Sequence, residues 1–225
     1  DYVTIKYNSL GQDLWKRAMN RNTNGNDVAF AMACDASSNV YVTGRSSNGT
    51  DFDYLTVKYE GANGIEQWRA AMNGAADITP WNDTSYAIAV DNAGNVIVTG
   101  QSDQDNTAAP SVTNPVHRTV KYNAGGTQQW RAAVNGSGTG VDIYSALAVD
   151  SAGNINTTGF SNNAGNNDLV VVKHSPGGVE QWRKFVCGAG SNSGAVLMAI
   201  NVDSTGNVVV AGHLDNGSDN DFLVA

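Results

Sequence analysis

The chain has 225 residues and a formal net charge of −8, and only 15% of its residues are charged. This length suits one large all-β domain. The acidic balance argues against nucleic acid and anionic membrane surfaces as partners, because both attract basic proteins. No run of eighteen apolar residues occurs, so the sequence predicts no membrane span.

The chain opens on a strand-like segment, 1–7, which recurs at four further places: 53–59, 118–122, 168–174 and 221–225. A second segment with a tryptophan follows the first four copies, at Trp15, Trp68, Trp130 and Trp182. One tryptophan per repeat at the same strand position favours packing between neighbouring sheets over a set of sugar-stacking platforms.

Next comes a segment in which small and large residues alternate, such as 86–90, and this pattern is typical of a strand. Its small residues, Ala87 and Ala89 in this copy, suit the innermost strand of a crowded fold. The strand after it, 96–99, is apolar on both faces, as expected of a strand between two sheets. The turn joining them reads Asp-x-x-Gly-Asn, and we expect its Asp to bond the turn backbone and its Gly to take a positive φ.

The turn and the second strand form a ten-residue phrase that occurs at 91–100, 150–159 and 203–212, and more loosely at 35–44. A period of roughly fifty residues rich in strand formers predicts a β-propeller, all-β and built from four-stranded blades of about 52 residues. We therefore treat 1–225 as a single propeller domain or propeller fragment. Its divisions are a partial blade 1–28, blades at about 29–84, 85–143 and 144–196, and a partial blade 197–225.

The 1–7 type of strand occurs five times, whereas each of the others occurs four times. A four-blade ring would leave one of these strands redundant. A fragment of a six- to eight-bladed ring would not, and we favour the fragment. Pairing with another chain is a third alternative, because open edge strands invite partners.

These repeats resemble the bacterial β-propeller repeat family labelled SBBP. The resemblance rests on Val40-Tyr41-Val42-Thr43-Gly44, the Asp-x-x-Gly-Asn turns and the Gly-x-x-x-Trp segments, and it covers essentially the whole chain. It implies a propeller fold and an extracytoplasmic location: secreted, on the cell surface or periplasmic. It carries over no catalytic motif.

Acidic residues recur two apart before some copies of the 1–7 type of strand, at Asp51 and Asp53 and again at Asp219 and Asp221. They are the candidate metal ligands, and Ca²⁺ is the ion that such oxygen donors would suit. Local backbone bonding by Asp and Asn is the alternative that we favour, so no cofactor is expected.

Two connections are longer than their counterparts, and in a propeller both emerge on the same face. This loop-rich face is the candidate binding surface, and its candidate residues are Trp81, Asp83, Asp103, Asp105 and His117. We place His117 in the second long loop.

We expect Cys34 and Cys187 to be small buried residues, with a disulfide as the alternative.

No catalytic residue is predicted, since no nucleophile elbow, P-loop or dinucleotide motif is present. The sequence favours a non-enzymatic propeller that serves as a protein-interaction scaffold or surface-assembly component, with another protein or a second copy as partner. The alternative is a carbohydrate-binding, lectin-like propeller that uses Trp81 and is assisted by Ca²⁺. An enzyme, a hydrolase or lyase with its site at the channel mouth, is the third hypothesis.

Overall fold

The structure is a computed structural model that describes residues 1–21, 25–73, 82–102, 116–134, 143–163, 166–186, 196–215 and 220–224. All of its regular elements are β-strands, which pair antiparallel with their neighbours in the chain. The all-β prediction is therefore confirmed. No helix within these ranges is long and apolar enough to cross a membrane.

The strands form successive sheets, three of them four-stranded. The first contains β1 (Tyr2–Tyr7) and β2 (Asp13–Met19). The second contains β3 (Asp27–Cys34), β4 (Val40–Ser47), β5 (Phe52–Tyr59) and β6 (Glu66–Met72). The third contains β7 (Thr84–Val90), β8 (Val96–Ser102), β9 (Val116–Tyr122) and β10 (Gln128–Val134). The fourth contains β11 (Ile143–Val149), β12 (Ile155–Asn163), β13 (Asn166–His174) and β14 (Glu180–Val186). The last contains β15 (Val196–Val202), β16 (Val208–Asp215) and β17 (Asn220–Val224).

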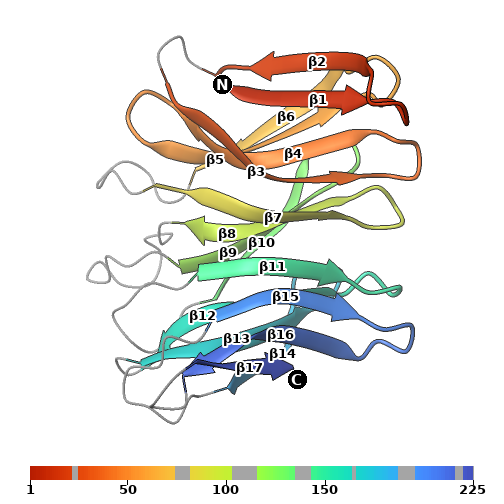
Figure 1. Cartoon of the computed structure of the whole chain (residues 1–225). Coiled ribbons are helices and arrows are strands. Elements are labelled where there is room, and N and C mark those ends of the chain that lie inside the picture. Colours follow the sequence, from red (N-terminus) through yellow and green to blue (C-terminus); the bar gives the residue numbers. More distant parts are fainter. Residues whose placement is uncertain are drawn as a thin grey trace.

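The sheets follow one another in chain order from one end of the molecule to the other, and the two termini lie at opposite ends (Figure 1). The opening strands of the last four sheets, β3, β7, β11 and β15, lie side by side in sequence. The described residues do not bring the first and last sheets together into a closed ring.

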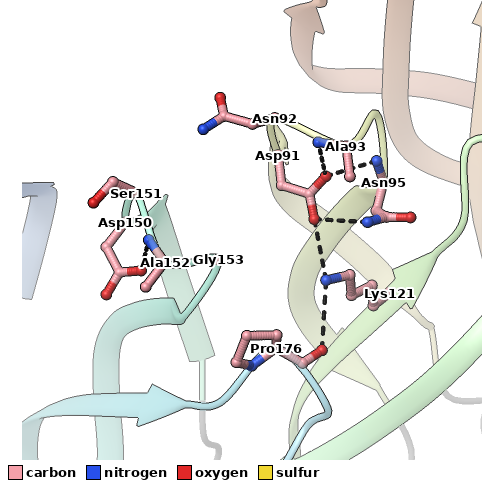
Figure 2. Close-up of a pocket in the computed structure, with 10 residues that line it drawn as sticks. All are labelled: Asp91, Asn92, Ala93, Asn95, Lys121, Asp150, Ser151, Ala152, Gly153 and Pro176. Atoms are coloured by element: carbon pink, nitrogen blue, oxygen red, sulfur yellow. Dashed lines mark hydrogen bonds and ion pairs between the residues drawn. The ribbon is translucent and has the colours of Figure 1, made fainter.

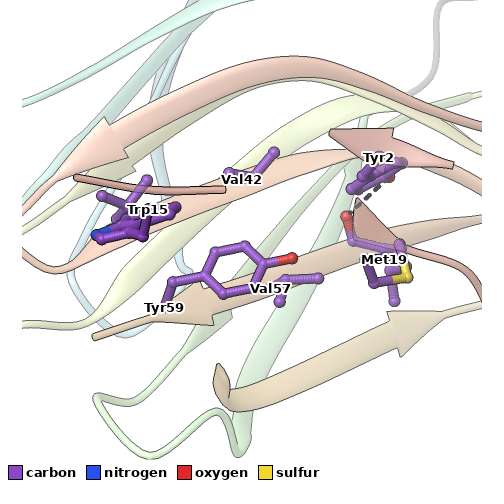
Figure 3. Close-up of a cluster of buried hydrophobic side chains, with 8 residues drawn as sticks. Tyr2, Trp15, Met19, Val42, Val57 and Tyr59 are labelled. Atoms are coloured by element: carbon purple, nitrogen blue, oxygen red, sulfur yellow. Dashed lines mark hydrogen bonds between the residues drawn. The ribbon is translucent and has the colours of Figure 1, made fainter. Parts of the chain in front are cut away.

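Apolar side chains hold each sheet to the next. In the first cluster Tyr2, Trp15 and Met19 of the first sheet pack on Val42 and Val57 of the second (Figure 3). Tyr41, next to Val42 on β4, belongs instead to the cluster shared with the third sheet. Successive strand residues point to opposite faces, so both faces of β4 are buried, as its apolar sequence predicts.

The tryptophans make a repeated joint between sheets. The indole Nε1 of Trp68 donates to the carbonyl of Ala124 at 3.0 Å, in the turn that joins β9 to β10 of the next sheet. Its ring lies against Gly126, whose φ is +83°. Trp15 and Trp130 repeat this joint on the turns at Gly64 and Gly178. The prediction that the tryptophans pack between sheets is confirmed for these three.

The turn between the first two strands of each unit is built as predicted. Asp91 accepts bonds from the backbone N of Ala93 and Asn95 and from the Asn95 amide, at 3.0, 2.8 and 2.8 Å. Gly94 has a φ of +77°. In the first copy Ser38 replaces this glycine and is held at a φ of +64°, a strained conformation for a residue with a Cβ.

The opening strand β3 differs from its counterparts. On β7, Ile88 is partly buried against the cluster shared with the second sheet. The equivalent residue on β3, Met32, is 60% exposed, because neither strand of the first sheet within the described residues covers it. Cys34 is a free and exposed thiol for the same reason, so the expectation of a buried residue is wrong there. Cys187 lies outside the described residues.

Candidate functional site

The candidate binding residues are only partly placed by the structure. Trp81, Asp103 and Asp105 lie outside the described residues. Asp83 precedes β7 and is 1% exposed, and its backbone N donates to the Phe52 carbonyl at 2.8 Å. Its side chain therefore faces the protein interior rather than an open binding face.

His117 lies in strand β9 and is fully buried, so its placement in the long loop is wrong. The strand begins at Val116, directly after the undescribed segment. The His117 Nε2 lies 2.5 Å from Thr99 Oγ1 and 3.2 Å from Thr119 Oγ1. Burial lowers the pKa of His117 well below its ordinary value, and the nearby His174 and Arg118 act in the same direction. His117 is thus a neutral core residue.

The burial of His117 predicts an acid-sensitive fold. A histidine whose folded pKa is depressed stabilises the protein fully above its ordinary value near 6.5, and this contribution is lost as the pH falls below that value. We expect the wild type to lose stability through this group as the pH falls from 6.5 to 5, because the unfolded chain binds a proton that the folded protein does not. Urea titrations at several pH values give the free energy of unfolding at each pH. Between pH 6.5 and pH 5 we expect this free energy to fall less steeply with pH in H117Q than in the wild type. An equal dependence on pH in the two proteins would contradict this account.

The candidate metal residues Asp51 and Asp53 lie at the start of β5, where nitrogen donors already engage them. Asp53 is 1% exposed and forms an ion pair with Arg21. The amide of Asn48 donates to Asp51, and also to Asp53 at 3.2 Å. Burial raises the pKa of Asp53, although Arg21 opposes the shift. A guanidinium thus stands where a bound cation would have to approach.

The second pair of candidate metal residues is less completely placed. Asp219 is outside the described residues. The backbone of Asp221 pairs with Leu214 in β16, and the side chain of Asp221 is not described. Over the parts of the chain that the structure describes, no three His, Cys, Asp or Glu side chains gather as a metal site would require.

A hollow of about 300 Å³, lined in part by charged side chains, lies between the turns of the third and fourth sheets (Figure 2). Lys121 from β9 reaches across it, with its Nζ 3.1 Å from Asp91 Oδ2 and 3.4 Å from the Pro176 carbonyl. Burial alone would raise the pKa of Asp91, but bonds from Asn95 and Lys121 outweigh it and hold the pKa below its ordinary value. In the fourth sheet, Lys173 pairs with Asp150 at 3.0 Å. The lysines and aspartates at this hollow pair with one another, so they leave no unpaired charge for a ligand. Because Lys121 also bonds the Pro176 carbonyl of the fourth sheet, we interpret the hollow as a structural contact between the two sheets.

An apolar groove of about 440 Å³ runs between β1 and β3. The larger side chains along it are well exposed: Val3 52%, Tyr7 54%, Phe30 45% and Met32 60%. One wall of the groove is an edge of β1 that pairs with no other strand within the described residues. Strand β1 pairs only with β2, whereas the equivalent strands β5, β9 and β13 pair on both sides. The groove, defined by these four side chains and the β1 edge, is the candidate functional site.

The sequence contains five copies of the β1 type of strand, but it predicts the binding surface on the long loops. The signal for the groove was present in that count, because a strand of this type normally has a partner on each side. Compared with models of known protein families and with curated protein sequences, the chain matches none.

Proposed function

We propose that the sheets are blades of a β-propeller and that the protein is a non-enzymatic, extracytoplasmic interaction scaffold or surface-assembly component. Three features support the propeller: the repeated sheets, the neighbouring opening strands and the tryptophan joints. The polar but weakly charged composition and the family resemblance support a location outside the cytoplasm. Several ionisable side chains support a structural role, since Asp91, Lys121 and Asp53 are engaged in ion pairs within the fold.

The observation that carries the function is the groove beside β1. An unpaired strand edge offers backbone N–H and C=O groups to another strand, and alternating pockets give selectivity. Exposed apolar side chains beside such an edge mark a protein contact more than a sugar contact. The proposed partner is therefore a protein segment that adds a strand to β1 and covers Phe30 and Met32.

A binding experiment tests this function. Extracellular proteins from the producing cells are passed over the wild type and over the double variant F30D/M32D. Each protein retained only by the wild type is then purified and titrated by calorimetry. We expect saturable binding that F30D/M32D weakens at least about tenfold, while V179D, at an exposed turn residue distant in sequence from the groove, leaves it unchanged.

Equal binding by the wild type and the groove variant would contradict the proposal. A panel of glycans tested in parallel separates it from the lectin-like alternative. Saturable sugar binding that is lost in Trp81→Ala would favour that alternative.

A further inference from the structure

We propose that Arg45 binds the carboxylate of an acidic side chain in a partner protein. Arg45 lies near the end of β4 and Phe52 begins β5, so the site is on the loop-rich face, from which the β4–β5 and β6–β7 connections leave. The inference goes beyond the proposed strand addition, because Arg45 does not line the groove beside β1.

Arg45 lies on the face of β4 that turns toward the third sheet. Thr43, two residues before it, bonds Ser85 of β7 at 2.6 Å, and residues two apart in a strand share a face. Phe52 turns the same way, because Tyr54, two residues after it, donates to a backbone carbonyl of the third sheet. The second and third sheets each have four strands, so Arg45 lies inside the series of sheets rather than at either end of it.

Aromatic rings hold the Arg45 guanidinium in place. Its Cζ lies 4.6 Å from the centre of the Phe52 ring and 6.0 Å from that of the Phe30 ring. The Phe30 ring in turn makes an edge contact with Tyr86 of the third sheet, at a centroid distance of 5.5 Å. A guanidinium is attracted to the face of an aromatic ring, and this contact restricts the arginine to few rotamers. The N–H groups along the edge of the guanidinium remain for a ligand.

No carboxylate pairs with Arg45 within the described residues, although other enclosed cations of the fold are paired. Lys121 lies 3.1 Å from Asp91, and Lys173 lies 3.0 Å from Asp150. The Arg45 side chain is partly buried, and its Nε is a buried donor without a partner in the described parts of the chain. A cation that is partly removed from water without a counter-charge is unfavourable, and a bound anion offsets that cost.

A carboxylate is the anion that fits this arrangement. The guanidinium presents planar pairs of N–H donors that match the two oxygens of a carboxylate. One arginine balances one negative charge, which suits a carboxylate better than a phosphate dianion.

The surroundings favour a protein side chain over a sugar acid as the source of this carboxylate. Phe30, Phe52 and Tyr86 surround the guanidinium mainly with ring surface, whereas a sugar requires several polar partners for its hydroxyl groups. The expected ligand is therefore an acidic residue with apolar neighbours in its own chain.

The test titrates the purified protein with a short peptide that carries one glutamate between two leucines and is blocked at both ends. A single carboxylate limits the repulsion from the protein's net charge of −8. The readout is the side-chain Nε–H signal of Arg45 in a nitrogen–proton NMR spectrum, identified by its absence in R45K. We expect this signal to shift saturably with the glutamate peptide and to stay in place when glutamine replaces the glutamate. The signal of Arg69, which bonds Glu66 through Nε and Nη2 at 2.6 Å each, is the internal reference.

Backbone signals of β4 and β5 follow the same titration in variants, and each spectrum shows first that the variant is folded. We expect R45Q to weaken binding at least about tenfold. We expect R45K to weaken it as well, because lysine keeps the charge and loses the planar pairs of donors. R69Q is the matched control, since it removes an arginine that Glu66 already engages, and it should bind like the wild type.

An Arg45 signal that stays in place, or one that shifts equally with both peptides, overturns the proposal. Undiminished binding by a folded R45Q overturns it too. An oligosaccharide of galacturonic acid is titrated in parallel. Saturable binding of this sugar acid without binding of the peptide would assign Arg45 to a carbohydrate and would refute the protein ligand.

A further variant separates this site from the groove beside β1. M32D changes the groove and leaves the contacts of Arg45 intact, so it should bind the glutamate peptide like the wild type. Loss of peptide binding in a folded M32D would show that the peptide occupies the groove and would overturn the assignment to Arg45.

Discussion

Replacing Gly126 with alanine is expected to lower the free energy of unfolding by about 3 kcal/mol. A Cβ at this position would lie 2.6 Å from the Trp68 ring, and the backbone φ of +83° is itself unfavourable for alanine. The ring has little room to retreat, because it packs between Tyr41 and Tyr122 at centroid distances of 6.1 and 6.2 Å. Equilibrium urea unfolding at low protein concentration measures the loss.

The matched control for this variant is G206A, which has the same backbone penalty without a ring to meet. We expect it to lose only about 1 kcal/mol. The difference between the two variants measures the tryptophan joint. Equal losses would mean that the joint contributes nothing beyond the backbone conformation of its glycine.

Asp91→Ala is expected to destabilise the protein by about 3–5 kcal/mol, because it leaves Lys121 buried without its partner. The side chains of Lys121 and Asp91 are 7% and 9% exposed. The substitution also removes the bonds that Asp91 makes to the turn. The free energy of unfolding, measured with urea at neutral pH, gives the size of the effect. The lowered pKa of Asp91 predicts in addition how the effect changes with pH. A depressed carboxyl pKa gives stability that is present above about pH 4 and lost as the pH falls, so the D91A penalty should shrink in acid.

The control is Asp203→Ala, which changes an equivalent turn that no lysine bonds within the described residues. Asp203 accepts bonds from Thr205 and Asn207 as Asp91 does from Ala93 and Asn95. We expect a clearly smaller loss in D203A, and the difference between the two variants reports the ion pair. A loss in D203A as large as that in D91A would assign the whole effect to the turn.

Most of the local architecture was predictable from the repeated phrase. The alternation of small and large residues predicted the strands, and the Asp-x-x-Gly-Asn turns predicted the hairpins. The repeated tryptophans predicted the contacts between sheets. The glycine that ends each phrase was not explained by sequence reasoning. A Cβ on Gly44 would lie 2.0 Å from the Val28 carbonyl, because β3 carries a bulge next to Ala29. The same bulge recurs in β7, β11 and β15.

The site was less predictable, for identifiable reasons. His117 directly follows a long irregular segment of the sequence, and a polar histidine at that place is easily assigned to the loop. Counting back five residues from Tyr122 places it where the second sheet has Tyr54, which is also fully buried. The exposure of Phe30 and Met32 depends on what the first sheet lacks. Strand periodicity reports the face on which a residue lies, and it does not report whether a neighbouring sheet covers that face.

Hydrogen exchange along β1, measured without and with the purified partner protein, tests the central claim most directly. An open strand edge leaves alternate amides without partners, so these amides exchange quickly, while paired amides are protected. We predict that half of the β1 amides exchange far faster than those of β5 in the free protein and become protected when the partner binds. Slow exchange throughout β1 in the free protein would show that its edge is already covered, and amides that stay unprotected with the partner bound would show that no strand is added there.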